Sequence, residues 1–451
     1  MNRLSSEVIS RITRCLLDEG SADSRPIIPL THVCRFWRKV VVSTPEYWTS
    51  ISNERVGLAK LSLERARGAP LKVWLDMPLV KGNPEFYDHL APHAENTKSL
   101  IVDSVLHGGQ LVQMLHNFPR SMPGLRSLTL SGDASSVDLF GSFAPNLTYL
   151  SLTTIPLYPS FRRLRTLTDI TLRNHRFDLH IATLLDFLEE NRSLERVTLE
   201  IDFTYVLLRA LPPRRAVIIE RLRYLSIRCN DAMDNRALIS NIALPRGAYL
   251  EIGCRDPGAG LNSVLIGIPA VQLPNLLSST HMEYECWSTS IRLFGPNGGF
   301  SFENPLSLVV PFVELLLLPT INVQELHLRH CRVREGFQPP LPLVFPPLFF
   351  PSLKVLTVDG EVSNLFSALF ANPSYPPSLE TITFLDCDLA DSFIQQLAWF
   401  AFSRKKTTST SLHCVIITNS KGSFPSAVPI ATLRKYVPVV HTQVGDKLVT
   451  R

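Results

Sequence analysis

One short pattern of apolar residues recurs along this chain and restricts the folds that it can adopt. The pattern is apolar-x-x-apolar-x-apolar, and nine copies begin at Leu125, Leu147, Leu167, Leu194, Leu222, Val323, Leu353, Leu379 and Leu412. Successive copies start 22, 20, 27 and 28 residues apart in the first group, and 30, 26 and 33 residues apart in the second. A pattern that returns at such steps predicts an array of similar units rather than separate domains.

The alternation inside each copy is that of a β-strand with one buried face, because successive strand side chains point to opposite sides. A single strand cannot bury its apolar row, so neighbours must stack in parallel and helices must cover the buried face. Residues 181–190 and 393–402 have apolar residues at helical spacing and are candidate covering helices. We therefore predict an α/β fold, an irregular leucine-rich-repeat solenoid with a parallel sheet on its concave side and helices and loops on its convex side.

Weaker copies extend the array, and one stretch interrupts it. Residues 71–75 are expected to form its first strand, followed by a strand near Leu100 and Val102, and another near Leu250 and Ile252. Between 256 and 322 the pattern lapses, and we interpret this stretch as degenerate repeats or an insertion. Within it, residues 290–294 and 300–302 flank a glycine-rich segment and predict a hairpin. The proline-dense stretch 338–351 predicts an extended surface connection.

Composition and motifs exclude several classes of function. A formal charge of +5 over 451 residues, with only short and scattered basic clusters, gives no case for a nucleic-acid partner. The eight cysteines form no CxxC pair, and no nucleophile, phosphate-loop or zinc-protease motif has the surroundings that it needs. In the run 327–331, His327 and His330 fall on opposite faces of a strand and do not converge on a metal. We expect neither an enzyme nor a cofactor.

The chain is also expected not to enter a membrane. Its most apolar stretch, residues 306–318, is interrupted by Pro311 and Glu314 and is shorter than the roughly 20 residues of a spanning helix. The first ten residues have no apolar segment of the kind found in a secretory signal. We expect a cytoplasmic or nuclear protein with reduced thiols.

The first fifty residues have helical rather than strand periodicity. Val8, Ile9, Ile12 and Leu16 form one face of a first helix. A second helix is expected to run from Leu30 to Thr44, where Pro45 ends it. Its apolar face holds Leu30, Val33, Cys34, Trp37, Val40 and Val41. So small a segment is marginal by itself, so it either caps the array or docks on another protein.

Specific residues of this segment resemble a known family. The stretch LSSEVISRI, followed by PLTHVCRFWRKVVVSTPEYW, is similar to an F-box, most closely in VCRFWR and in the later Pro45 and Trp48. Ser5 stands where the family usually has proline. The rest of the chain, including LLDFLEENRSLERVTLEI, resembles F-box proteins with leucine-rich-like repeats from mushroom-forming (basidiomycete) fungi.

The resemblance implies a substrate-recognition subunit of an SCF-type E3 ubiquitin ligase complex. Its F-box would bind the Skp-family adaptor, and through it a cullin scaffold, while the repeats bind a target protein. The alternative is a non-catalytic repeat scaffold whose F-box-like helices only cap the solenoid. The adaptor-binding residues implied by the resemblance are Leu4, Val8, Ile9, Ile12, Leu30, Val33, Cys34, Trp37, Pro45 and Trp48.

The expected organisation is an F-box over 1–52, a transition over 53–96, repeats over 97–255, degenerate repeats or an insertion over 256–322, and repeats over 323–451. In a solenoid of this kind, polar residues between the buried leucines line the concave sheet. Aromatic and arginine side chains there are the usual anchors of interfaces. The candidate target-binding residues are Tyr149, Arg173, Arg196, Tyr224, Arg228, His327 and Arg329.

Overall fold

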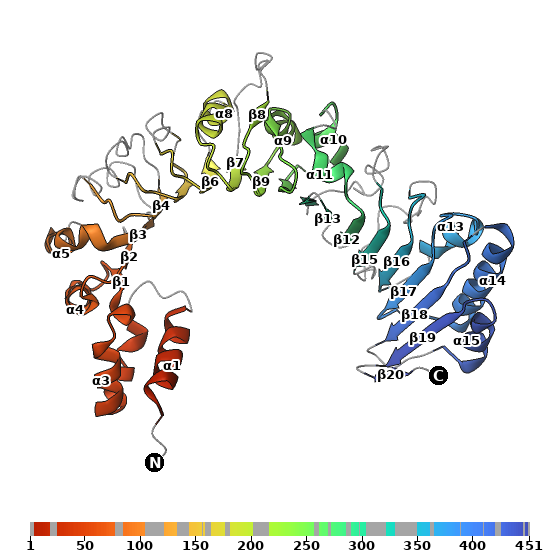
Figure 1. Cartoon of the computed structure of the whole chain (residues 1–451), viewed down its shortest axis with the longest axis horizontal. Coiled ribbons are helices and arrows are strands. Elements are labelled where there is room, and N and C mark those ends of the chain that lie inside the picture. Colours follow the sequence, from red (N-terminus) through yellow and green to blue (C-terminus); the bar gives the residue numbers. More distant parts are fainter. Residues whose placement is uncertain are drawn as a thin grey trace. The chain divides into compact units, whose positions relative to one another are not determined.

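The computed structural model shows a mixed α/β protein whose strands are mostly parallel (Figure 1). It describes residues 4–18, 25–76, 84–103, 121–132, 144–155, 157, 164–175, 181–201, 216–256, 261–268, 272–285, 290–296, 298–303, 322–329, 350–360, 365–387, 389–408, 410–419, 425–444 and 447–449. The chain divides into two compact units, Met1–Pro213 with Ile219–Leu222, and Arg214–Ile218 with Arg223–Arg451. This division falls inside the predicted stretch 97–255.

The first unit begins with helices and continues as a parallel sheet. Its strands pair in sequence order, β1 with β2 through to β6 with β7. They are β1 (Ser50–Ser52), β2 (Leu71–Asp76), β3 (Thr97–Asp103), β4 (Ser127–Ser131), β5 (Tyr149–Thr153), β6 (Asp169–His175) and β7 (Arg196–Ile201). The helical elements are α1 (Ser6–Asp18), η1 (Arg25–Ile27), α2 (Leu30–Val33), α3 (Arg35–Ser43), η2 (Pro45–Trp48), α4 (Val56–Ala66), α5 (Pro84–Leu90), η4 (Ala91–Asn96) and α8 (Ile181–Glu190).

The second unit contains two runs of parallel strands separated by antiparallel pairings around β13, and its last strand, β20, is antiparallel to β19. The strand order is β9, β11, β14, β13, β12, β15, β16, β17, β18, β19 and β20. Their bounds are β9 (Tyr224–Cys229), β11 (Tyr249–Cys254), β12 (His281–Glu285), β13 (Ser290–Gly295), β14 (Gly298–Glu303), β15 (Glu325–Arg329), β16 (Val355–Asp359), β17 (Thr381–Leu385), β18 (Cys414–Asn419), β19 (Val439–Val444) and β20 (Lys447–Val449). A separate pair joins β8 (Val217–Ile218) to β10 (Ile242–Ala243).

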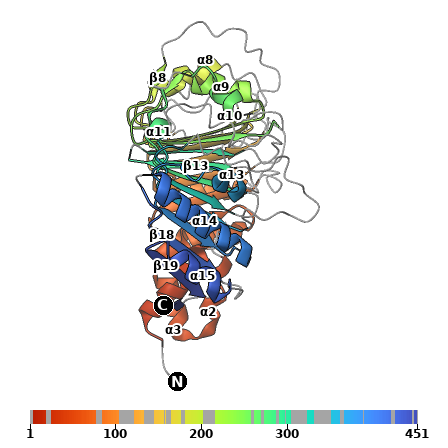
Figure 2. The same ribbon diagram turned by 90° about the vertical axis from the view of Figure 1, so that its right-hand side faces the viewer.

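Helices cover the apolar face of this second sheet. They are α9 (Ala232–Ile239), α10 (Leu261–Leu265), α11 (Pro274–Leu277), α13 (Leu365–Ala371), α14 (Asp391–Thr407) and α15 (Ala427–Arg434). The ring of Phe384 on β17 lies 5.3 Å from Phe366 on α13 and 5.6 Å from Phe393 on α14. Figure 2 shows α14 and α15 lying over β18 and β19. The packing is that expected when a one-sided apolar sheet must exclude water.

The register of the strands explains the recurring sequence pattern. Equivalent apolar positions pair directly across the first sheet, for example Leu128 with Leu150, and Leu150 with Ile170. The same holds in the second sheet, where Leu326 pairs with Leu356, and Leu356 with Ile382. All of these side chains are buried. All nine predicted strands are present, as are the expected strands at 71–75, near 100–102 and at 250–252 and the helices at 181–190 and 393–402. The strand at 71–75 is not the first of the array as predicted, because β1 precedes it and pairs with it in parallel.

The interrupted stretch contains the predicted hairpin and three elements that the sequence pattern missed, the helices α10 and α11 and one strand. Strands β13 and β14 pair antiparallel, and Gly298 in their turn has φ +102°, a value that favours glycine. The missed strand is β12, which pairs antiparallel with β13 and parallel with β15. The proline-dense connection predicted over 338–351 lies outside the described residues except for Phe350 and Pro351.

One predicted helix is wrong in its continuity. The expected helix from Leu30 to Thr44 is broken at Cys34, which is extended with φ −161° and ψ 173°, so α2 and α3 are separate. In a continuous helix the Thr31 carbonyl would accept the N–H of residue 35. Here it instead accepts the Nε–H of Arg38 at 2.7 Å, so a side chain satisfies the carbonyl that the break releases.

Candidate functional site

The N-terminal helices have one buried side and one exposed apolar side. Ile9 and Thr13 of α1 are fully buried, as are Val41 of α3 and Trp48 of η2. The Trp48 Nε1–H donates to the Val41 carbonyl at 2.9 Å, and the Arg65 guanidinium lies 4.2 Å from the centre of the Trp48 ring. These contacts form a small core that holds the helices together.

Several large apolar side chains of the same N-terminal segment are exposed instead of buried. Four of the eleven exposed large hydrophobic residues among the described part of the chain fall within its first 36 residues: Leu4, Val8, Val33 and Phe36. We call these four the N-terminal apolar surface. Val33 is the most open of them, with 58% of its surface exposed. Since exposed apolar surface is unfavourable in water, four such side chains within one short segment are typical of a surface that another molecule covers.

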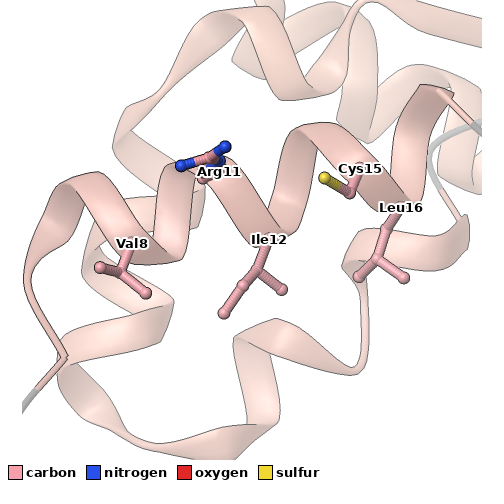
Figure 3. Close-up of a pocket in the computed structure, with 5 residues that line it drawn as sticks. All are labelled: Val8, Arg11, Ile12, Cys15 and Leu16. Carbon is pink, nitrogen blue, oxygen red and sulfur yellow. The ribbon is translucent and has the colours of Figure 1, made fainter. Parts of the chain in front are cut away.

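A shallow hollow of about 480 Å³ adjoins this surface along α1. Figure 3 shows that Val8, Ile12 and Leu16 project to the same side of the helix, as their i, i+4 spacing requires. Arg11 and Cys15 complete its lining. The hollow is therefore apolar along its length and carries one cation at its edge.

The structure separates the ten residues implied as adaptor-binding into three groups. Leu4, Val8, Val33 and Cys34 are exposed, and Ile12, Leu30, Trp37 and Pro45 are half-buried. Ile9 and Trp48 are fully buried, so their side chains contribute to the chain's own core instead of facing a partner. Phe36, which is also exposed, was missed because it does not share the helical spacing of Leu30, Val33 and Trp37.

The exposed faces of the two sheets hold the residues predicted to contact a target. In the first unit, Thr129, Ser151, Thr171 and Thr198 form a column of hydroxyl groups in register. Tyr149, Arg173 and Arg196 flank this column and are exposed. Each arginine has a carboxylate partner on the neighbouring strand: Arg196 lies 2.9 Å from Asp169, and Arg173 lies 3.6 Å from Glu200.

In the second unit, Tyr224 and Arg228 both engage Glu251. The Tyr224 hydroxyl donates to one Glu251 oxygen at 2.5 Å, and the Arg228 Nη2 lies 2.5 Å from the other. Burial, followed by the hydrogen bond and the charge of Glu251, raises the pKa of Tyr224 to about 12. Burial alone would raise the pKa of Glu251, but its bonds from Tyr224 and Arg228 outweigh that effect and lower it. Glu251 is therefore ionised at neutral pH.

Glu283 on β12 is the centre of a second polar group on the same face. Its carboxylate lies 2.9 Å from Arg329, 3.8 Å from His281 and 3.9 Å from Arg292. His281 also lies 3.1 Å from Glu325. His327 sits beside this group, and its Nε2 is buried without a hydrogen-bond partner among the described residues. All four arginines predicted to contact a target are thus paired with carboxylates.

An aromatic row runs across the strands beside these charges. The rings of Tyr224 and Tyr249 are stacked with centres 6.0 Å apart, Tyr249 lies 6.4 Å from Phe294, and Phe294 lies 5.8 Å from His281. Gly299 makes room for the row, because a Cβ there would lie 2.6 Å from the Tyr249 ring. Gly253 similarly leaves room for Arg228, whose Cγ would lie 2.7 Å from an added Cβ. The sequence analysis did not single out Tyr249, Phe294, His281 or Gly299 as site residues. The last three fall within the interrupted stretch 256–322, where the repeat pattern gives no guide.

Comparison with models of protein families gave no match, and no significantly similar curated protein was found. Among the described residues, none of the helices has the length and apolar character needed to cross a membrane. The same residues contain no group of three or more His, Cys, Asp or Glu side chains arranged to hold a metal ion.

Proposed function

We propose that this chain is an F-box protein with leucine-rich-like repeats and acts as the substrate-recognition subunit of an SCF-type E3 ubiquitin ligase complex. The observation that carries the proposal is the N-terminal apolar surface, which stays exposed although the same helices have a complete core of their own. On this proposal the surface binds a Skp-family adaptor, and the adaptor joins the chain to a cullin scaffold. The residues with this role are the eight that are exposed or half-buried among those implied by the resemblance, together with Phe36.

The proposed mechanism is tethering, with no chemistry on this chain. The repeats hold a target protein, and the adaptor brings it near an enzyme charged with ubiquitin. Holding two reactants on one assembly raises their effective concentration without any new covalent step. The proposed organisation is an α/β solenoid of irregular repeats, as the paired apolar positions of successive strands favour. The protein would work in the cytoplasm or nucleus.

One observation favours the alternative, a repeat scaffold capped by its N-terminal helices. Strand β1 follows η2 directly and pairs in parallel with β2, the next strand of the first sheet. The helical segment is thereby joined to the sheet edge, as a terminal cap would be. Under this alternative the exposed apolar residues have no adaptor to bind.

A binding measurement with two double variants separates the proposals. Val8→Asp with Val33→Asp places carboxylates on the N-terminal apolar surface, and both positions are exposed, so the fold is retained. We expect affinity for a Skp-family adaptor to fall on the order of 100-fold, because an interface that buries an unpaired carboxylate loses several kcal/mol.

The matched control is Met233→Asp with Val428→Asp, which makes the same charge change at exposed apolar positions elsewhere. Its adaptor affinity should equal that of the unaltered chain, and circular dichroism should show that both variants are folded. If the unaltered chain does not bind the adaptor, or if both double variants lose binding equally, the adaptor proposal is wrong.

A further inference from the structure

The exposed face of strands β9 to β15 has an excess of negative charge. We call it the β9–β15 face, formed by the outward side chains of β9, β11, β14, β13, β12 and β15. It carries five carboxylates and three guanidinium groups: Glu251, Glu283, Glu285, Glu303 and Glu325, with Arg228, Arg292 and Arg329. The chain as a whole has a formal charge of +5, so this acidity is local.

The arginines of this face are already engaged by its carboxylates. Arg228 lies 2.5 Å from Glu251 and 3.8 Å from Glu303, and Arg329 lies 2.9 Å from Glu283. Two of the carboxylates stay open to solvent, since the side chains of Glu303 and Glu325 are 46% and 58% exposed. The guanidinium groups are also open to solvent, at 41–49% exposure of their side chains, but each is held by a carboxylate. The face as a whole therefore keeps two more carboxylates than guanidinium groups.

The aromatic row supplies a second feature that suits a cation. Tyr224, Tyr249 and Phe294 present ring surface beside the carboxylates, and Phe294 is exposed. Ring faces attract guanidinium and ammonium groups, and arginine also stacks on them. Gly299 is required for this arrangement, because a side chain there would displace the Tyr249 ring that joins the two ends of the row.

From the charge excess and the aromatic row together, we propose that the β9–β15 face binds a basic, arginine-containing extended segment of a partner protein. The row and Glu325 occupy aligned positions from β9 to β15, five strand steps across the sheet. At about 4.8 Å per step the row spans about 24 Å, the length of about seven extended residues. Arginines of the segment would lie over the rings and pair with Glu303 and Glu325.

This inference takes one point from the proposed role in target recognition, namely that the ligand is a segment of a protein. The charge complementarity stands without it. Complementary charges at an interface raise the association rate and specify the partner, and their effect weakens as salt screens them.

Fluorescence anisotropy of the full-length chain with labelled peptides of about nine residues tests the inference. One peptide alternates arginine with serine, and matched peptides carry glutamate or glutamine in place of arginine. We expect saturable binding of the arginine peptide only, weakening as sodium chloride is raised. Equal binding of the glutamine or glutamate peptide, or no binding of the arginine peptide, would overturn the inference.

Two variants locate the binding on the β9–β15 face. Glu303→Gln with Glu325→Gln should weaken the arginine peptide about tenfold through the loss of two exposed ion pairs. Phe294→Leu keeps an apolar side chain but removes one ring, and should weaken it about threefold. The control is Asp169→Asn with Glu200→Gln, the same change of charge on the first unit's sheet, which should leave affinity within twofold. An equal loss in this control would place the binding elsewhere.

Adaptor binding measured on the same preparations keeps the two proposals apart. The Glu303→Gln with Glu325→Gln variant should bind the adaptor normally, and the Val8→Asp with Val33→Asp variant should bind the peptide normally. If the chain binds the arginine peptide but not the adaptor, the proposed function is wrong and the inference stands. If it binds the adaptor but not the arginine peptide, the inference is wrong and the proposed function stands.

Discussion

Arg404 illustrates how a charged residue can become part of a core. It lies on α14 with no exposed surface, and its guanidinium donates to the carbonyl oxygens of Pro373, Pro376, Pro377 and Leu379 at 2.8–3.2 Å. The loop that carries these oxygens contains three prolines, which have no N–H to donate, so the donors must come from elsewhere. Burial lowers the pKa of Arg404 to about 10, so the side chain remains charged at neutral pH.

Replacing this side chain should be costly. Arg404→Met keeps the aliphatic volume but leaves buried carbonyls without donors, and we expect a loss of about 3 kcal/mol in the free energy of unfolding. Urea denaturation followed by circular dichroism measures it. Lys405→Met alters the exposed neighbouring cation and should change stability by less than about 0.5 kcal/mol. Equal stability of both variants would contradict this role for Arg404.

His327 links the β9–β15 face to pH. Burial, followed by repulsion from Arg329, lowers the pKa of His327 below its ordinary 6.5, although Glu283 and Asp359 oppose the shift and His281 adds to it. The folded chain therefore favours the neutral ring, while the unfolded chain takes up a proton near pH 6.5. Its contribution to stability is fully present above pH 6.5 and is lost as the pH falls through the lowered pKa.

His327→Gln removes this titration and should make the stability of the chain less sensitive to acid. The midpoint of urea unfolding, compared at pH 7.5 and pH 5.0, should fall less in the variant than in the unaltered chain. His413→Gln, at an exposed histidine, is the control and should leave the difference unchanged. If the urea midpoint falls equally between pH 7.5 and pH 5.0 in the unaltered chain and in His327→Gln, His327 is not the source of this acid sensitivity.

At the scale of elements, glycines decide how closely strands and side chains approach. Gly299→Ala on β14 should push the Tyr249 ring aside, since the added Cβ would lie 2.6 Å from two ring atoms. We expect a stability loss of about 1 kcal/mol, because the ring can rotate away, together with a changed near-UV circular dichroism signal from the tyrosines.

Gly57→Ala is the matched control. Nothing lies within 4 Å of the Cβ that it adds on α4, and alanine favours a helix, so it should stabilise the chain by about 0.5–1 kcal/mol. The near-UV signal should stay unchanged. If Gly299→Ala changed neither the stability nor the near-UV signal more than Gly57→Ala does, the aromatic row would not depend on the space above Gly299.

Elements were predictable from sequence where a local pattern determined them. Alternation identified β4 to β7 and β15 to β18, because one face of each strand is buried against helices or turns. The break between α2 and α3 was not predictable, because the apolar spacing of Leu30, Val33 and Trp37 fits one helix as well as two. The break is accompanied by a side-chain hydrogen bond from Arg38 to the Thr31 carbonyl, which the apolar spacing does not indicate.

For each unit as a whole, neighbouring strands supply the burial that a single strand lacks. In the first unit the strand order follows the sequence, so local spacing predicts the neighbours. In the second unit β11 pairs with β14 rather than with β12, because two antiparallel pairings reverse the order from β12 to β14. This reversal brings Tyr249 beside Phe294 and creates the aromatic row.

The sequence by itself determined which residues are buried in the strands, because alternation is a local property of the chain. It also indicated the helical N-terminal segment and the aligned polar columns. Only the tertiary structure decided which side of the N-terminal helices stays exposed and which carboxylate each arginine meets. Those outcomes depend on contacts between residues far apart in sequence, such as Arg329 with Glu283, and no local pattern records them.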